Sequence, residues 1–220
     1  GDVRGAQVGG VMNLSTGATR GLQLASVLNV TTHDVTGAQI ATANVAGPVD
    51  GLQLGVVNVG RKVRGLQLGV VNVAEDVDGA AIGLVSISRD SVHPLAWSSN
   101  LAYSNVGVKF ASKYVFTMIG AHSGTLDNGF DEVGGTFAIG GHLPLPESFD
   151  LEAQAAYTQT TQWKQGDGHK ENTWFSPQIA AGYSFATHLR AFVGGGVRVP
   201  ISVQTARDVA RPEMLAGVQF

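Results

Sequence analysis

The side chains best suited to catalysis are two histidines with polar neighbours: His122 beside Ser123, and His169 near Glu171. A histidine that converges with a serine and an acid can activate a hydroxyl nucleophile. Adjacent residues on a strand point to opposite faces, so His122 and Ser123 do not form a ready nucleophile pair. The six histidines show no metal-ligand spacing, and the chain has no cysteine. The sequence therefore predicts no enzyme, cofactor or metal site.

A second set of polar side chains occupies one face of alternating segments in the second half of the chain. These candidate lumen charges are Lys109, Asp150, Glu152, Arg190, Arg198, Arg211 and Glu213. If the segments close into a barrel, its interior is just wide enough to be filled by side chains. Opposite charges at one height would then pair as a plug, because an unpaired buried charge costs several kcal/mol. A narrow polar channel is the alternative.

The overall composition limits the class of protein. The 220 residues carry a net charge of −3, 14% are charged and 44% are hydrophobic. Nucleic-acid binding needs a basic patch, so this balance argues against a nucleic-acid partner. Thirty glycines point to β structure, and no apolar run reaches the roughly 18 residues of a membrane helix. An all-β protein is expected.

The first ninety residues repeat a short unit. Its clearest copies are GLQLGVVNVGRKVR at 51–64 and GLQLGVVNVAEDVD at 65–78. Aligned on the leading glycine, six copies begin at Gly5, Gly21, Gly37, Gly51, Gly65 and Gly79, with spacings of 16, 16, 14, 14 and 14 residues. The sixth copy departs from the pattern, with Ala81 and Ser86 in the Gln and Asn positions. A fixed short period indicates a solenoid.

Each repeat predicts one coil of a β-solenoid, because 14 residues cannot supply two membrane-crossing strands of about 9 to 11 residues. Coils stacked at about 4.8 Å bring equivalent residues into columns. We expect Leu22, Leu52 and Leu66 inside and glycines at the corners. Stacked amides would form a hydrogen-bonded ladder from Gln7, Gln23, Gln39, Gln53, Gln67, Asn13, Asn29, Asn44, Asn58 and Asn72.

The amide columns could also serve as a recognition surface. Calcium-binding repeats of the GGxGxD type are absent. The columns also lack the threonine arrays expected of an ice-binding face. A structural ladder is the preferred interpretation, and a surface that binds a ligand or glycan is the alternative.

After residue 90 the repeat stops and a period of two begins. Segments of about ten residues carry one apolar face and one small or polar face, as in VGGTFAIGGHLPL and FDLEAQAAYT. This is the pattern of a transmembrane β-barrel. Seven strands begin near Asn105, Tyr114, Glu132, Phe149, Thr173, Leu189 and Pro212, and an eighth around Leu95 to Leu101 would complete the smallest usual barrel. Short connections alternate with long ones, such as HSGTLDNGFDE and TTQWKQGDGHKEN.

Aromatic residues support this arrangement because they fall near the strand ends, as interfacial girdles do. Phe110, Phe149, Phe185 and Phe220 lie at short turns or at the last residue, and Tyr157, Trp163, Trp174 and Phe175 lie near long loops. We therefore expect residues 1–90 to form a GLQxGxxNV repeat solenoid of about six coils, and residues 91–220 to form a small antiparallel barrel of about eight strands.

Two resemblances accompany these patterns. The last strand, with Met214, Ala216, Val218 and Phe220 on one face, resembles the C-terminal phenylalanine strand of bacterial outer-membrane barrels. The repeats resemble bacterial surface proteins built from GLQxGxxNV units, which implies no particular activity. The first resemblance implies a bacterial outer-membrane location, with membrane lipid as a partner and the barrel-assembly machinery as a partner during biogenesis. Other envelope proteins are a further class of partner.

Together these features predict a non-enzymatic outer-membrane protein whose barrel is an anchor and whose repeats form a structural or binding surface. The first alternative is a small channel with the repeats as plug or vestibule. The second is a lipid-modifying outer-membrane enzyme, which the spacing of the histidines disfavours.

Overall fold

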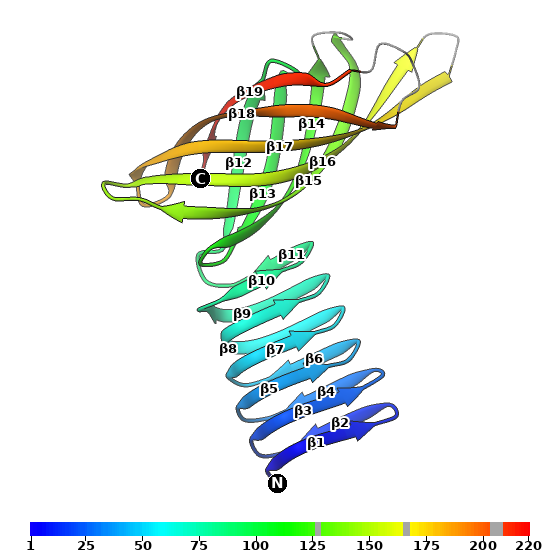
Figure 1. Cartoon of the computed structure of the whole chain (residues 1–220), viewed down its shortest axis with the longest axis vertical. Helices are drawn as coiled ribbons and strands as arrows, with labels where there is room; N and C mark the ends of the chain where they lie inside the picture. Colours follow the sequence, from blue (N-terminus) through cyan, green and yellow to red (C-terminus); the bar gives the residue numbers. More distant parts are fainter. Residues whose placement is uncertain (126–128, 165–167, 203–208) are drawn as a thin grey trace. The chain divides into compact units, whose positions relative to one another are not determined.

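The computed structural model describes residues 1–125, 129–164, 168–202 and 209–220, without the side chains of 130, 164, 168 and 169 (Figure 1). The described elements are β-strands, and the fold is all-β as predicted. Within these ranges, no helix has the length and apolar character to cross a membrane. The chain divides into two compact units, residues 1–92 with 110–117, and residues 93–109 with 118–220.

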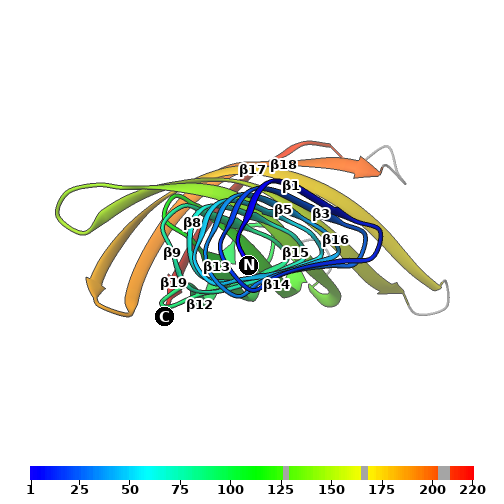
Figure 2. The ribbon, with the colours of Figure 1, turned by 90° about the horizontal axis from the view of Figure 1, so that it is seen from below.

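The first unit contains the predicted β-solenoid. Its strands are β1 (Val3–Gly9), β2 (Met12–Ser15), β3 (Thr19–Ala25), β4 (Leu28–Thr31), β5 (Val35–Ile40), β6 (Ala43–Ala46), β7 (Val49–Leu54), β8 (Val57–Leu68), β9 (Val71–Val77), β10 (Ala80–Ile82) and β11 (Val85–Ile87). They form two parallel arrays, one along β1, β3, β5, β7 and β8, the other along β2, β4, β6 and β8. Seen end on, successive coils superpose (Figure 2).

The coils stack in the register that the repeat alignment predicts. Gly5 pairs with Gly21 and Gly21 with Gly37, and the glutamines and asparagines pair in the same way. Parallel pairing places identical positions above one another at about 4.8 Å. Each of the two 16-residue copies has one extra residue in the turn between its two strands and one in the corner that leads to the next copy. These extra residues do not shift the register of the paired strands. The 16-residue and 14-residue copies therefore form one continuous stack.

The interior of the solenoid differs from the prediction. Gln23 and Gln53 are fully buried, whereas Leu22, Leu52 and Leu66 are only partly buried and lie on the outer face. The reason is strand parity, since Leu52 and Gln53 are neighbours and must point to opposite sides. The amides are inside, so the leucines are outside. The expectation of an internal leucine column is wrong.

A small apolar cluster completes the interior beside the amide columns. Val35, Val49 and Val63 are almost fully buried and pack with Ala46 and Ala74. These three valines each stand two residues before a leading glycine, and they pair from coil to coil to form a column. The interior of each middle coil is therefore half amide and half aliphatic.

Segment 110–117 groups with the solenoid and contacts its last coil. Ser112 Oγ accepts a hydrogen bond of 3.3 Å from the Ala81 amide, and Lys113 Nζ donates to Asp78 Oδ1 at 2.8 Å. That hydrogen bond lowers the pKa of the Asp78 carboxyl and raises the pKa of Lys113. Solenoid ends need such a cap, because the last coil has no successor to pair with.

The second fold is a closed antiparallel barrel of eight strands, which confirms the eighth strand. Its strands are β12 (Val92–Ser99), β13 (Ser104–Ala111), β14 (Val115–Thr125), β15 (Gly129–Pro144), β16 (Phe149–Lys164), β17 (Gly168–Ala186), β18 (Leu189–Ser202) and β19 (Arg211–Gln219). β12 closes the barrel on β19, where Leu95 pairs with Gln219.

The long connections of the prediction are largely strand. HSGTLDNGFDE enters β14 as far as Thr125 and β15 from Gly129, and TTQWKQGDGHKEN is divided between β16 and β17. β17 has 19 residues, against the roughly 9 to 11 that a tilted strand needs to cross a bilayer. Polar residues continue the ladder there, as in the pairing of Gln162 with Lys170. The ends of these hairpins are thus polar, and β17 is longer than a bilayer crossing requires.

Candidate functional site

The amide columns of the solenoid hydrogen-bond from coil to coil. Each glutamine donates to the glutamine of the preceding coil, at 2.8 to 2.9 Å. Each asparagine donates to the asparagine of the following coil, at 2.9 to 3.0 Å. The two columns therefore run in opposite directions, so their amide dipoles oppose each other. All ten predicted amides lie in these two columns.

The asparagine column has a second role at the turn between the two strands of a coil. Asn58 Nδ2 donates to the carbonyl of Leu68 at 3.0 Å, and Asn44 Nδ2 donates to that of Leu54 at 2.9 Å. A buried carbonyl without a donor is costly, and the end of a strand leaves such groups. The side-chain amide supplies the donor in coil after coil.

The departures of the sixth repeat have visible consequences. Ser86 Oγ accepts the hydrogen bond of Asn72 at 3.1 Å and so ends the asparagine column. Ala81 has no polar side chain, and the buried Oε1 of Gln67 has no hydrogen-bond partner among the described residues. Both columns therefore stop at the sixth coil.

We expect Asn58→Ala to lower the free energy of unfolding of the solenoid by about 2–3 kcal/mol. The substitution removes hydrogen bonds to Asn44, Asn72 and the Leu68 carbonyl and leaves buried groups without them. Denaturant unfolding followed by circular dichroism measures the effect. Val57→Ala, at a neighbouring outward position that is 37% exposed, is the matched control and should change stability by less than about 1 kcal/mol. Equal effects of the two substitutions would contradict the role of the ladder.

The barrel interior holds a first group of paired charges near one end. Lys109 Nζ lies 2.8 Å from both carboxylate oxygens of Glu152. Arg190 donates to Asp150 through two nitrogens and lies 3.1 Å from Glu152 Oε1. These side chains come from β13, β16 and β18, so the network crosses the lumen. Four of the seven predicted lumen charges meet here.

A second group lies further along the interior. Arg198 donates to Glu213 at 2.9 Å, and Gln178 donates to the other oxygen of Glu213 at 2.8 Å. Gln154 donates to Gln178 at 2.6 Å, which continues the chain of polar contacts towards Glu152. Arg211 faces Arg198 across the β18–β19 ladder. Sequence reasoning missed the two glutamines, although both have the inward parity of the charged residues.

Little empty volume remains in the lumen beside these groups. The cavity between Lys109, Glu152, Met118 and Phe192 measures about 20 Å³, which is room for about one water molecule. Apolar inward side chains, Leu95 and Met118 among them, are buried in the same region. Ion pairs and packed side chains thus obstruct the barrel at this height.

The outer face of the barrel carries the aromatic rows. Phe149 pairs with Tyr183, with ring centroids 4.8 Å apart, and eight residues along the same strands Tyr157 pairs with Phe175. Eight residues of a strand tilted by about 40° rise roughly 20 Å. Among the predicted girdle residues, those that are exposed are Phe149, Phe185, Phe220, Tyr157, Trp163 and Phe175.

Two predicted girdle residues are buried and not exposed. Trp174 is 9% exposed and faces the interior, because it is adjacent to the outward Phe175. Phe110 is 8% exposed and belongs to the segment that groups with the solenoid. These two assignments are corrected. Tyr183, which the prediction omitted, takes a place in the row with Phe149.

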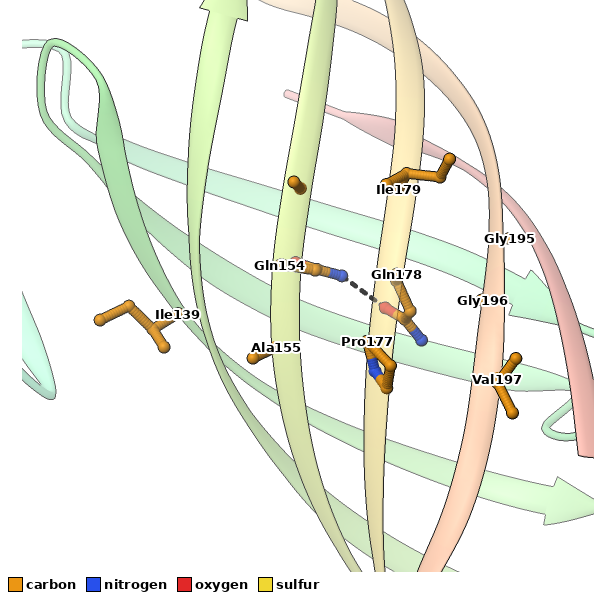
Figure 3. A pocket seen from close by; sticks show the side chains of 10 residues that line it. Ile139, Gln154, Ala155, Pro177, Gln178, Ile179, Gly195, Gly196 and Val197 are labelled. Carbon is orange, nitrogen blue, oxygen red and sulfur yellow. Dashed lines mark hydrogen bonds between the residues drawn. The ribbon is translucent and has the colours of Figure 1, made fainter. Parts of the chain in front are cut away.

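Between the aromatic rows, the exterior has a shallow apolar depression of about 690 Å³ (Figure 3). It is lined by small residues such as Ala153, Ala155 and Gly195, and by the larger Ile139, Ile179 and Val197. The hydrogen-bonded Gln154 and Gln178 lie on the inward side of the same strands. The depression offers apolar contacts on the exterior of the barrel.

The histidine with catalytic potential lies inside the barrel. His122 is buried, and neither ring nitrogen has a hydrogen-bond partner in the described part of the chain. Ser123 follows it on the strand and therefore points to the other face. No cluster of three metal-ligating side chains occurs among the described residues. The side chain of His169 lies outside the described residues. The geometry provides no assembled nucleophile at His122.

Comparisons with known proteins show a similarity at the level of solved structures. No protein-family model and no curated protein matches the chain. Among solved structures, the chain is similar to the crystal structure of Neisserial surface protein A (NspA), with 10% sequence identity and a TM-score of 0.39, covering 58% of this chain and 92% of that one.

Proposed function

We propose that this chain is a non-enzymatic protein of the bacterial outer membrane, anchored by its barrel, with the solenoid as a structural or binding surface. The proposal rests on the distribution of side chains in the barrel, which is the reverse of that in a soluble protein: apolar side chains face outward and charged side chains face inward. Ile179, Val193 and Met214 on the outside are 63 to 70% exposed, while charged pairs fill the inside. An apolar band of this kind between aromatic rows matches a lipid-facing barrel surface.

The height of the band supports the same proposal. The aromatic rows are separated by roughly 20 Å along the barrel axis, close to the apolar band of about 25 Å in outer-membrane barrels. Leu151, Ala153 and Ile179 occupy this interval and are exposed. Membrane lipid is then the partner of the barrel, and the barrel-assembly machinery is its partner during insertion.

Extraction of the full chain from membranes tests the anchor. We expect the protein to remain with the outer-membrane fraction after washes with salt and alkali, and to require detergent for release. Unheated samples should run on gels as a compact species that shifts on boiling, because a closed barrel resists detergent at room temperature. A chain that is monodisperse in buffer without detergent would contradict the proposal.

The channel alternative predicts an open pathway, whereas the lumen contains the Lys109–Glu152 and Arg198–Glu213 pairs. We expect no stable open currents when the purified chain is inserted into planar bilayers. A porin measured in the same bilayers controls for the recording, and the heat-shifted gel species shows that the barrel is folded. Reproducible conductance steps would overturn the closed-lumen interpretation.

Among the described residues, the geometry gives no support to the enzyme alternative. A lipid-modifying enzyme needs a nucleophile and a base within hydrogen-bond distance near the rim of the barrel. Buried His122 and the oppositely directed Ser123 do not meet this requirement. The non-enzymatic anchor is therefore preferred.

A further inference from the structure

The solenoid separates charged from apolar residues around each coil. Residues 1–90 contain 13 Asp, Glu, Lys and Arg residues. All are exposed, and all lie at one end of the coils, which we call the charged edge: Asp2, Arg4, Arg20, Asp34, Asp50, Arg61, Lys62, Arg64, Glu75, Asp76, Asp78, Arg89 and Asp90. Pairs in adjacent coils, such as Lys62 and Asp76 at 3.5 Å, neutralise one another along this edge.

The opposite end of the coils, the apolar tip, has no charged residue. It consists of residues 9–11, 25–27, 41–42, 55–56, 69–70 and 83–84, which are glycine or apolar except for Ser26 and Thr42, and the Thr42 hydroxyl donates to the Ser26 carbonyl at 2.8 Å. Val56, Val70 and Leu84 are 46 to 47% exposed there. Both outer faces next to the tip are apolar as well, with Leu54 and Leu68 on one face and Val57 and Val73 on the other. The outward side chains within three residues of the tip are all apolar, so they extend the apolar surface onto both faces.

Lipid contact requires that backbone polar groups be satisfied without water, and the tip meets this requirement at its central coils. The Val56 amide donates to the Thr42 carbonyl at 2.8 Å, and the Val70 amide donates to the Val56 carbonyl at 2.9 Å. The asparagine column supplies the donors for the carbonyls of Leu54 and Leu68. The asparagine side chains therefore satisfy backbone carbonyls beside the turn, so that the apolar turn can be buried in lipid without unpaired polar groups.

From this arrangement we infer that the apolar tip and the faces beside it insert into a lipid bilayer, with the charged edge at the aqueous boundary. The inference rests on the proposed membrane function and names bilayer lipid as the partner of the solenoid. From Gly51 to Val56 a strand spans about 16 Å, close to one leaflet of a hydrocarbon core of about 30 Å. The solenoid would therefore lie within one leaflet.

A bilayer fits this surface better than a second copy of the chain. Two folded copies in contact would cover one face each, whereas lipid covers both faces and the tip at once. The exposed apolar side chains of the solenoid also match in kind those on the barrel exterior, such as Val193 and Ile179. Only residues 88–91 separate the last solenoid strand from the first barrel strand.

The test uses the full chain, which has no cysteine of its own. Val56→Cys at the tip, Lys62→Cys at the charged edge of the same coil, and Ile179→Cys on the barrel exterior each receive a bimane fluorophore. The labelled proteins are reconstituted in phosphatidylethanolamine–phosphatidylglycerol vesicles that contain either doxyl-chain lipid or external iodide. We expect doxyl lipid to quench positions 56 and 179 about twofold or more, and iodide to quench position 62.

The outcomes separate this inference from the proposed function. If position 179 is quenched by doxyl lipid while position 56 responds to iodide, the barrel is inserted and the inference is wrong. If neither position responds to doxyl lipid, the proposed membrane function fails and the inference fails with it. If position 56 is shielded from both quenchers and becomes accessible on dilution with empty vesicles, a second copy covers the tip and the inference is again overturned.

Discussion

Gly65→Ala is expected to destabilise the solenoid by about 4 kcal/mol or more, enough to unfold the neighbouring coils. Gly65 has a φ of +143°, and a Cβ at this position would overlap the carbonyl oxygen of Gly51 in the coil below. Relief would require a backbone shift in the Gly51–Gly65 pairing, and the same contact recurs between Gly37 and Gly51. Denaturant unfolding of the full chain in detergent, followed by circular dichroism, measures the loss.

Substitutions of two glycines in the first coil distinguish the clash between coils from the backbone strain of a positive φ. Gly10 has open space around it and no positive φ, so Gly10→Ala should leave stability within about 1 kcal/mol of the parent. Gly5 has a φ of +95° but no heavy atom within 4 Å of an added Cβ, so Gly5→Ala should show only the backbone strain of about 1–2 kcal/mol. A Gly65→Ala effect no larger than that of Gly5→Ala would rule out the clash between coils.

Glu152→Leu is expected to lower the stability of the barrel by about 3–5 kcal/mol, because it breaks one side of a buried ion network. Glu152 is 11% exposed and accepts two hydrogen bonds from Lys109, whose side chain is 4% exposed; Arg190 lies 3.1 Å away. Removing the carboxylate leaves two cations close together in a lumen with little room for water. The loss of the compact gel species with rising urea measures the effect.

The double variant Lys109→Met with Glu152→Leu provides the control. It removes both members of the pair and leaves an apolar contact, so it should be more stable than Glu152→Leu alone. Glu152→Gln keeps the size and one acceptor and should lie between the parent and Glu152→Leu. If the double variant loses as much stability as Glu152→Leu and a separately measured Lys109→Met together, the pair is not coupled and the network does not stabilise the closed lumen.

Much of the fold could be predicted because both halves have a strict period. The glycine, glutamine and asparagine positions fix the coil register, and the structure pairs Gln53 with Gln67 and Asn58 with Asn72 accordingly. In the barrel, the alternation along FDLEAQAAYT places Asp150 and Glu152 inside and Leu151 outside, as the exposed fractions show. Period alone determines which residues share a face.

Period does not determine which face is inside. The leucine prediction assumed that leucines fill the solenoid, yet amides share its interior with the valine and alanine cluster, because stacked side-chain amides satisfy one another in a narrow interior. The position of Trp174 near a strand end favours a girdle, but its parity, opposite to that of the exposed Phe175, places it inside. The cap formed by segment 110–117 joins residues more than thirty positions apart, as between Ala81 and Ser112, and no local pattern carries that information.

The identical register of the middle coils also bears on how such a chain can change in evolution. Residues 51–64 and 65–78 are nearly the same sequence, and each coil bonds only to its neighbours. An in-frame duplication of 42 nucleotides, encoding one 14-residue unit, would offer the same donors and acceptors above and below. The solenoid could thus gain or lose length by about 4.8 Å per unit while both terminal coils stay unchanged, so that copy number sets its reach.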